Sequence, residues 1–431
     1  MPLEYGGWDH SCRAEGRLIM GDGLGDNVRD YRRAAGWTQE ELAHAAGLSA
    51  SVVRKAEQGG NVRMETLHIL ARALGEETSA LMASAPLEPR EPDDGHTLRI
   101  MELRKALLPP IGFAVEAPAP DEAPHLAALR EVARQVNRSY YGDAYGKLAA
   151  DLPALIREAD AAVRFYASGP EREEALSVRV AVLRTAARYL TQVREHDLAY
   201  ESLRRLLADG QALDNELDVA SAASGMCWVL LGQGRFAESV RLARETADRI
   251  EPERISKAGD DHLAMWGWAH LRAVAAAVRN NQYEEAESSL RLAACAAGAL
   301  GREVSGTYQG GVTFGPVTVA MAEVEVATIK GDDRTVLERA DRETLAVKAR
   351  KTLGTPRPNS WFRHRMDVAL AHQRLGRHQE ATLELLDVRR KAPAWLSHQR
   401  AARDVMAGVH KGRKRSLTPE MREMSAFLGV R

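Results

Sequence analysis

The feature that most constrains the fold is a short pattern that recurs along the C-terminal part of the 431-residue chain. Its clearest copies begin at Gly234, Asn281 and Gly376, and weaker copies begin at Arg194 and Gly331. In each copy an apolar segment ends at a turn, and the sixth residue is an anchor that is small in most copies. The anchors are 40, 47, 50 and 45 residues apart, at positions 199, 239, 286, 336 and 381. This spacing predicts stacked helix pairs that share one continuous core.

The pattern resembles the tetratricopeptide repeat (TPR), although its units are longer than the nominal period of about 34 residues. From His125 onward, apolar residues recur at the helical spacing i, i+3, i+4 and i+7. Strand-type alternation is nearly absent, and only the conformation of the Gly/Thr/Val-rich segment 307–319 is left open. We therefore predict an all-α fold with a C-terminal TPR-like α-solenoid. The alternative is an irregular helical bundle.

The N-terminal region carries the strongest local motif. Thr38 is a candidate helix N-cap, and Glu41, three residues later, would complete a capping box. Gly47 then permits a tight turn, and Ser49 is a candidate cap for a helix that runs to about Gln58. A short capped helix with small, polar and basic residues on its outer face suits entry into the major groove of DNA.

This segment resembles the XRE family of helix-turn-helix domains, the Cro and phage-repressor type. The motif that carries the resemblance is Thr-Gln-x-x-Leu-Ala from Thr38, then Leu48-Ser49, then Glu57-x-Gly59. The resemblance covers residues 24–83 and implies a five-helix DNA-binding module. It also implies a buried ion pair between Arg32 and Glu57, which joins the first helix to the third and has a structural role.

The resemblance also implies which residues meet DNA. Gln39 is expected at a phosphate or a base edge, and Arg63 at the DNA backbone after the recognition helix. Ser51, Arg54 and Lys55 are expected to read bases, with Ala50 available for a thymine methyl group. Together with the two caps, the predicted DNA-binding set is Thr38, Gln39, Ser49, Ala50, Ser51, Arg54, Lys55 and Arg63.

The predicted domain order follows from these segments. Residues 1–23 form a Gly-rich flexible tail, and translation could begin at Met1 or at Met20. The helix-turn-helix domain occupies 24–84, and a Pro-rich linker with one short helix occupies 85–124. The TPR-like repeat domain, 125–431, is expected to carry ligand binding and dimerisation.

Charge and cysteine content narrow the possible functions. The chain has 59 lysines and arginines against 60 acidic residues, so contact with DNA requires a local patch. The three cysteines, Cys12, Cys227 and Cys295, show no metal-ligand or disulfide spacing, which fits a reducing compartment. No phosphate-binding loop, nucleophile elbow or convincing carboxylate pair is found. We expect no enzyme activity, no cofactor and no metal, no membrane segment, and a cytoplasmic, nucleoid-associated location.

The repeat region contains a second candidate site. In repeat register, six residues fall on the groove side of the first helices of their units: Arg184, Arg188, Trp228, Trp268, Arg363 and Met366. Arginines beside tryptophans could hold an anionic or amphipathic ligand. Ordinary packing between repeats and surface salt bridges are the alternative explanation for any one of these residues.

The combination resembles bacterial XRE–TPR regulators, which include Gram-positive peptide sensors and actinobacterial regulators. It implies a sequence-specific transcriptional regulator that binds a double-stranded operator as a homodimer and senses a peptide or a small molecule. Because the N-terminal module is close to neutral in charge, binding by one copy should be weak. The alternative is an interaction scaffold whose helix-turn-helix docks proteins.

Overall fold

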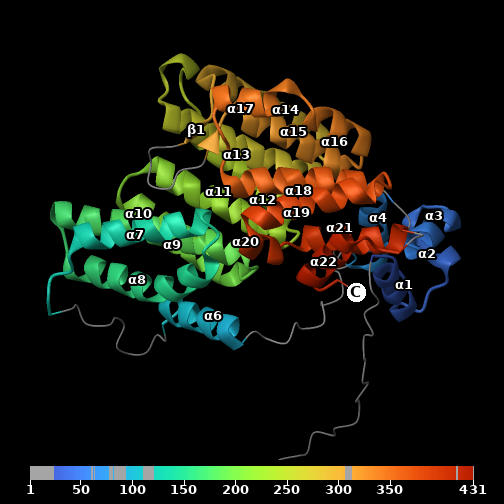
Figure 1. Cartoon of the computed structure of the whole chain (residues 1–431), viewed down its shortest axis with the longest axis horizontal. Helices are drawn as coiled ribbons and strands as arrows, with labels where there is room; N and C mark the ends of the chain where they lie inside the picture. Colours follow the sequence, from blue (N-terminus) through green and yellow to red (C-terminus); the bar gives the residue numbers. More distant parts are fainter. Residues whose placement is uncertain are drawn as a thin grey trace, which may run out of the picture. The chain divides into compact units, whose positions relative to one another are not determined.

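A computed structural model of the chain is shown in Figure 1. The structure describes residues 24–59, 62, 64–76, 81, 94–109, 121–305, 313–413 and 416–430. Over these residues the fold is all-α, as predicted, apart from one two-stranded sheet. The chain divides into two compact units, Met1–Glu91 and Pro92–Arg431.

Four described helices build the N-terminal unit: α1 (Leu24–Ala34), α2 (Gln39–Ala46), α3 (Ala50–Glu57) and α4 (Met64–Leu74). Their apolar faces meet in a core whose central side chains are fully buried: Val28, Leu42, Val53, Leu70 and Leu81. The expected fifth helix lies outside the described residues except for Leu81, and so does the expected tail, 1–23.

The second unit is a succession of helices with one small hairpin. Its elements are α6 (Asp94–Leu107), α7 (Leu126–Tyr141), α8 (Tyr145–Phe165), α9 (Gly169–Gln192), α10 (His196–Ala212), α11 (Glu216–Gly232), α12 (Phe236–Arg249), η1 (Ile255–Lys257), α13 (Asp260–Arg279), α14 (Tyr283–Leu300), β1 (Val304–Ser305), β2 (Thr313–Phe314), α15 (Pro316–Lys330), α16 (Asp333–Ala340), η2 (Glu343–Leu345), α17 (Val347–Leu353), α18 (Pro358–Arg374), α19 (His378–Lys391), α20 (Pro393–Ser397), α21 (Arg400–Gly412) and α22 (Pro419–Leu428).

The predicted repeats are present as helix pairs. α9 packs on α10, α11 on α12, α13 on α14, α15 on α16, and α18 on α19 (Figure 1). Every predicted anchor lies near the start of the second helix of its pair and is buried: Ala199, Ser239, Ala286, Val336 and Ala381. A small side chain there brings the two helices together, and at one anchor Ser239 Oγ also donates to the carbonyl oxygen of Cys227 (3.0 Å).

The first residue of each repeat copy has a backbone reason for its identity. All five copies begin with a residue in the left-handed region, with φ between +58° and +76°: Arg194, Gly234, Asn281, Gly331 and Gly376. Glycine adopts this conformation without steric cost, and asparagine tolerates it better than most residues. The recurring Gly or Asn therefore marks the turn between the two helices of a pair.

The end of the solenoid contacts its beginning. Asp143, in the turn between α7 and α8, accepts hydrogen bonds from the backbone N–H groups of Ala394 (2.7 Å) and Trp395 (2.6 Å) at the start of α20. The fully buried Trp395 also donates from its indole nitrogen to Gln192 at the end of α9 (3.0 Å). These contacts join residues more than 200 positions apart, so the stack of helix pairs closes on itself.

The segment whose conformation the sequence left open forms a hairpin. β1 pairs antiparallel with β2, with Val304 opposite Phe314, and residues 306–312 between them lie outside the described residues. The side chain of Trp268 in α13 donates to the carbonyl oxygen of Thr313 (2.9 Å). The hairpin is thereby held against the inner helices of the solenoid.

The short helix expected within the linker is α6. Its buried Ile100, Leu103 and Leu107 belong to the same core as α7 and α8. Because an apolar face of this size is stable only when covered, α6 is an integral part of the second unit. The proline-rich residues 82–93 and 110–120, which flank it, lie outside the described residues.

Candidate functional sites

The start of α2 has the predicted capping box. Thr38 Oγ1 accepts from the backbone N–H of Glu41 (3.1 Å), and the Glu41 carboxylate accepts from the backbone N–H of Thr38 (2.6 Å). Hydrogen bonding of the Glu41 carboxylate to the Thr38 backbone N–H, and then to the Thr38 side chain, lowers the pKa of Glu41. At the other end of α2, Gly47 has φ +63° and turns the chain toward α3. Glycine adopts this conformation without strain, whereas any other residue at position 47 would be strained.

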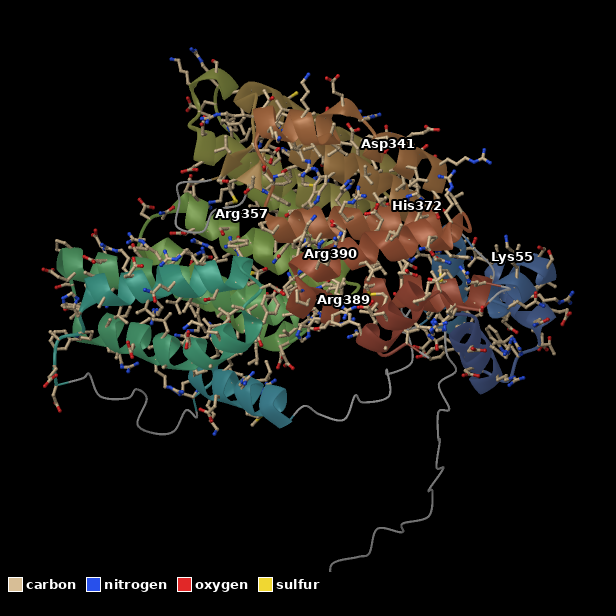
Figure 2. The ribbon with its side chains drawn as sticks, viewed as in Figure 1. Lys55, Asp341, Arg357, His372, Arg389 and Arg390 are labelled. Carbon is tan, nitrogen blue, oxygen red and sulfur yellow. The ribbon has the colours of Figure 1, made fainter. Side chains whose placement is uncertain are left out.

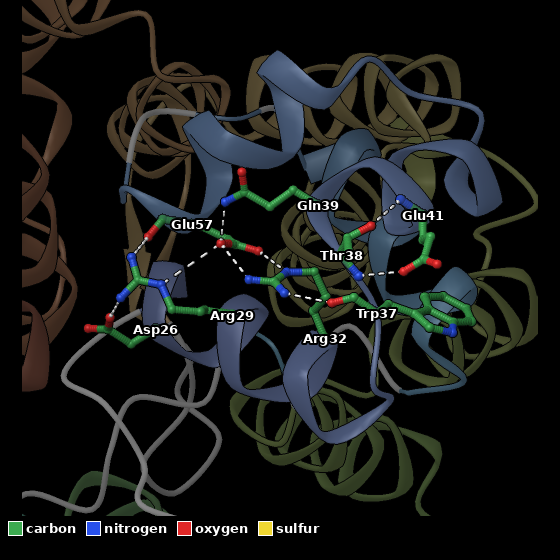
Figure 3. A network of polar contacts seen from close by, with 8 residues as sticks. All are labelled: Asp26, Arg29, Arg32, Trp37, Thr38, Gln39, Glu41 and Glu57. Carbon is green, nitrogen blue, oxygen red and sulfur yellow. Dashed lines mark hydrogen bonds and ion pairs between the residues drawn. The ribbon is translucent and has the colours of Figure 1, made fainter.

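A buried carboxylate organises the helices around α3. Glu57, with a side chain only 2% exposed, accepts from Arg32 Nε (2.5 Å) and from Arg32 Nη2 (3.1 Å) (Figure 3). Arg29 donates to the Glu57 carbonyl oxygen (3.0 Å), and Gln39 Nε2 donates to its carboxylate (2.7 Å). Thus α1, α2 and α3 meet at one side chain, and the predicted Arg32–Glu57 pair is confirmed.

The charges of this network lower the proton affinity of Glu57. Burial raises the pKa of Glu57, but the hydrogen bonds from Arg32 and Gln39 and the charges of Arg32 and Arg29 outweigh it. The pKa of Glu57 is therefore below its ordinary value, and that of Arg32 is raised. The side chain amide of Gln39 serves this network, while its predicted contact with DNA phosphate stays a prediction.

Glycine is required where α1 approaches the end of α3. A Cβ atom at Gly25 would lie 2.6 Å from the carbonyl oxygen of Glu57 and 2.6 Å from the backbone nitrogen of Gly59. Both are backbone atoms, which cannot move aside as a flexible side chain can. The close approach therefore fixes α1 against the C-terminal end of α3.

The outer face of α3 is polar and basic. Val53, Ala56 and Glu57 point into the domain, whereas Ser51, Arg54 and Lys55 are exposed and Ala50 is half-buried; Lys55 is labelled in Figure 2. The spacing of three and four residues places the exposed residues on one side of a short helix. The predicted reading residues are therefore together on one accessible surface.

Two members of the predicted DNA-binding set, Ser49 and Arg63, differ from the others. Ser49 is at the N-cap position of α3, but its side chain does not cap the helix; Ser49 Oγ instead lies 2.9 Å from Ser51 Oγ. The capping hydrogen bond expected of Ser49 is therefore absent. Arg63, the expected backbone clamp, lies outside the described residues.

The second unit encloses a cavity of about 220 Å³. Its walls come mainly from the inner helices α7, α9, α11, α13, α15 and α18, with Thr313 from β2 and Arg357 from the segment before α18. The cavity is thus lined by successive helix pairs from both ends of the closed solenoid.

Arg272 of α13 lies against two tryptophans in the cavity wall. Its guanidinium carbon is 4.7 Å from the ring centroid of Trp228 and 4.7 Å from that of Trp268. Its Nε donates to Ser224 Oγ (3.2 Å). Burial lowers the pKa of Arg272 to about 10. The guanidinium is therefore still charged at neutral pH, and two aromatic rings hold it in place.

Other guanidinium groups line the same cavity. The guanidinium carbon of Arg363 lies 4.3 Å from the Trp228 ring centroid, and burial lowers the pKa of Arg363. Arg188 donates to the Tyr141 hydroxyl (3.1 Å), and Arg357 lies 4.7 Å from the Tyr141 ring centroid. Within the part of the chain that the structure describes, neither Arg188 nor Arg363 forms an ion pair.

The acidic groups near the cavity do not balance these charges. Asp218 pairs with Arg184, and Glu325 pairs with Arg279 (2.9 Å). Burial, together with the neighbouring charge of Glu325, raises the pKa of Asp367 to about 8. The uncharged form of Asp367 is thereby favoured, which adds to the excess of positive charge in the cavity.

The structure brings together five of the six residues predicted for the groove. Arg184, Arg188, Trp228, Trp268 and Arg363 all line the cavity. Met366 does not, because its side chain is part of the hydrophobic core and is only 4% exposed. Whether the cavity binds a ligand stays a prediction.

Sequence reasoning missed several cavity residues. Arg272 follows Trp268 by four residues, so the two share a face of α13, and this spacing was the available signal. Asp367 follows the predicted Arg363 by four residues and carried the same signal. Tyr141 and Arg357 carried no such signal, and they line the cavity because closure of the solenoid brings the end of α7 and the segment before α18 together.

Other classes of site are not found among the described residues. No cluster of three or more histidine, cysteine or acidic side chains has an arrangement that could hold a metal ion there. None of the described helices combines the length and apolar character needed to cross a bilayer.

Comparison with known proteins identifies one part of the chain. Residues 28–81 match a family model described as helix-turn-helix. No curated protein matches the chain. Among solved structures, PlcR of Bacillus thuringiensis, crystallised with the peptide PapR7 and DNA, is similar with 15% identity over 65% of this chain and 96% of that chain. Its TM-score is 0.27, too low to establish a shared arrangement of the helices.

Proposed function

We propose, from the XRE-type helix-turn-helix domain that residues 28–81 form, that this DNA-binding transcription regulator acts as a homodimer and responds to a ligand in its second unit. The observation that carries the proposal is the division of α3 into two sides. Val53, Ala56 and Glu57 are buried, whereas Arg54 and Lys55 are exposed. A helix anchored in this way can enter the major groove without rearrangement of its own domain.

Each exposed side chain of α3 has a specific role in this proposal. Arg54 reads a guanine through its two N–H groups, a contact that contributes about 1–3 kcal/mol of discrimination against other bases. Ser51 makes a second polar contact, and Lys55 contacts a base edge or the adjacent phosphate. Thr38, Gln39 and Ser49, at the N-terminal ends of α2 and α3, lie near the DNA backbone.

Pairing of two copies provides the affinity that one module lacks. Residues 24–83 contain seven basic and eight acidic residues, so few phosphates are neutralised by each domain. Two recognition helices bound about 34 Å apart, one turn of the duplex, contact two half-sites and add their contributions. We place the dimer interface on the second unit, which is the larger part of the chain.

The cavity provides the means of regulation. It is lined by helices from both ends of the solenoid, including α9, α11 and α18. A peptide or small molecule bound there would draw the ends of the solenoid together and change the spacing of the two recognition helices in the dimer. Interdomain geometry would thus be the quantity that the effector controls.

The test of DNA recognition is a pair of substitutions on α3. Duplexes selected by the full-length protein from genomic fragments serve as the operator. Arg54→Ala with Lys55→Ala should weaken retention in a gel shift by about 10- to 100-fold, since a specific base contact and a phosphate contact are lost. Arg72→Ala, which removes an exposed arginine of α4, is the control and should change retention less than twofold.

The outcomes separate this function from the alternative. If the double variant retained the operator as well as wild type does, the assignment of α3 as the reading helix would be wrong. If wild type selected no sequence, the module would instead dock proteins. Truncation after residue 96 tests dimerisation: the isolated domain should stay helical by circular dichroism yet bind the operator at least tenfold more weakly.

A further inference from the structure

The lining of the central cavity combines charged and apolar side chains. It includes the guanidinium groups of Arg188, Arg272 and Arg363. The Glu325 carboxylate of α15 also lines the cavity, but it is paired with Arg279. The apolar lining comes mainly from α13 and α15, with these residues: Met265, Val274, Met321, Ala322, Val326 and Ile329. This combination suits a molecule with an anionic head and an apolar body.

Two of these arginines share one tryptophan. The guanidinium carbons of Arg272 and Arg363 lie 4.7 and 4.3 Å from the same ring centroid, that of Trp228. The two carbons are therefore at most about 9 Å apart, a separation that one carboxylate can bridge. Stacking on the ring occupies the faces of a guanidinium and leaves its N–H edge for an acceptor in the plane.

That edge is available on Arg272. Among the described residues, the only hydrogen bond of Arg272 is from Nε to Ser224 Oγ, so both terminal nitrogens have no protein acceptor. Arg363 forms no ion pair there either. Terminal nitrogens of this kind are the donors that bind a carboxylate with two parallel hydrogen bonds.

We propose that the cavity binds a small amphipathic organic acid, with its carboxylate between Arg272 and Arg363 and its apolar body against Met321 and Val326 of α15. This inference rests on the proposed effector role of the same cavity and names its ligand class. A volume of about 220 Å³ lies below the range of about 300–1,000 Å³ typical of drug-sized ligands, which favours a small molecule over a peptide.

The acid also explains why the cavity tolerates its excess of charge. Like charges repel, and the half-buried guanidinium groups of Arg272 and Arg363 lose part of their hydration. A bound carboxylate pairs both groups at once. An amide or alcohol of the same size has no negative charge to pair with either guanidinium. The site therefore discriminates strongly against neutral molecules.

The experiment uses full-length protein without DNA and three acids as probes: octanoate, phenylacetate and indole-3-acetate. Each is compared by isothermal titration calorimetry with its neutral amide. At least one acid should bind, and at least tenfold more tightly than its amide, because the charge-assisted hydrogen bonds are lost in the amide. If no acid binds at millimolar concentration, or if the amides bind equally well, the proposal is wrong.

Substitutions then locate the site. Arg272→Gln and Arg363→Gln should each weaken binding of that acid at least tenfold, whereas Arg204→Gln on the exposed side of α10 should leave it unchanged. Ala322→Trp, which places a large side chain in the cavity and keeps every arginine, should abolish binding. Unchanged affinity in Arg272→Gln or in Ala322→Trp would place the acid elsewhere and overturn the proposal.

Two measurements keep the result decisive. Circular dichroism reports whether each variant is folded, and if Arg272→Gln is not, Arg272→Lys keeps the charge and should still bind more weakly because lysine lacks the planar pair of donors. A gel shift on the selected operator is run with the same preparations. DNA retention without acid binding refutes only this inference, whereas loss of DNA retention in wild type refutes the proposed regulator.

Discussion

Arginine side chains have opposite settings in the two units. Around Glu57 in the N-terminal unit, Arg29 and Arg32 converge on one carboxylate, and Gln39 completes its hydrogen bonds. In the cavity of the second unit, Arg272 and Arg363 lie against tryptophan rings, and no carboxylate of the described residues pairs with either. The first arrangement has its counter-charge within the protein, whereas the second would receive one from the proposed acid.

Arginine thus has a structural role around Glu57 and, in our proposal, a ligand-binding role in the cavity. A buried charge with its partner holds helices in a fixed relation, and loss of the partner is costly. Buried charges without a partner add no such stability, but they are ready to pair with a ligand. We therefore expect the stabilities of the two units to respond in opposite ways to substitution and to pH.

The largest effect is expected at the complete network. Glu57→Ala leaves Arg29, Arg32 and Gln39 without their shared acceptor, so the free energy of unfolding of the N-terminal unit should fall by about 3–5 kcal/mol. In contrast, Arg272→Met in the cavity removes a charge that has no partner and should leave the stability of the second unit unchanged or slightly higher. Hydrogen exchange of α3 and α13 measures each unit separately. Equal destabilisation by the two substitutions would mean that the two arginine settings do not differ in their contribution to stability.

A smaller loss is expected where the solenoid closes. Asp143→Asn replaces a carboxylate that accepts two backbone hydrogen bonds at the start of α20. Bonds to a charged group contribute about 1.5–3 kcal/mol, so urea unfolding should show a loss of roughly that size. Asp214→Asn is the matched control, because Asp214 is exposed and also has positive φ. If the control lost as much stability, the hydrogen bonds of Asp143 to α20 would not account for the loss.

The two units should respond to pH in opposite directions. The pKa of Glu57 is lowered on folding, so its contribution is present above the unfolded pKa of about 4.3 and is lost as the pH falls. The pKa of Asp367 is raised to about 8, so the folded state keeps a proton that the unfolded state releases above about 4. Stability from this group therefore falls as the pH rises from about 4 to 8.

The charged groups that face Asp367 decide this sign. Glu325 on α15 adds to the effect of burial, whereas Arg279 on α13 and Arg363 and Arg374 on α18 oppose it. The free energy of opening of α18, obtained from hydrogen exchange after division by the intrinsic exchange rate at each pH, should therefore fall between pH 6 and pH 8, and Asp367→Asn should remove that dependence. The same slope in the Asn variant would assign the pH dependence to another group.

The smallest effect is expected at an outlying repeat. Arg194 occupies the left-handed turn position that glycine holds in three other copies. The left-handed conformation costs a residue with a side chain about 1–2 kcal/mol, a strain that glycine avoids. Glycine also has more conformational entropy in the unfolded state, which offsets about 0.5–1 kcal/mol of this gain. Arg194→Gly should thus raise the midpoint of urea unfolding by an amount that corresponds to about 0.5–1 kcal/mol. A lower midpoint would mean that the Arg194 side chain stabilises the fold.

Local features were predictable because their causes are local. The capping box at Thr38 and the left-handed turn at Gly47 depend on residues a few positions apart. The repeat anchors were found in the same way, since every helix pair obeys the same packing constraint. The ion pair of Arg32 with Glu57 came from resemblance to a family and was confirmed by the structure.

Nonlocal features could not be read in this way. The bond from Gln39 to Glu57 depends on how α2 meets α3, and it gives a residue expected at DNA a structural role as well. The groove prediction failed at Met366 because repeat register does not specify the rotation of α18 about its axis. It missed Arg357 because no sequence signal placed that residue opposite Tyr141.

By itself, then, the sequence determined an all-α chain with a helix-turn-helix at its N-terminal end and a series of helix pairs after it. Caps, turns and helical periodicity act over a few residues, and each leaves its mark in the sequence. Only the tertiary structure decided that the solenoid closes through Asp143 and Trp395, and that closure encloses arginines from α9, α13 and α18 in one cavity. Contacts across about 250 residues depend on the sum of many small rotations between helix pairs, which no local pattern records.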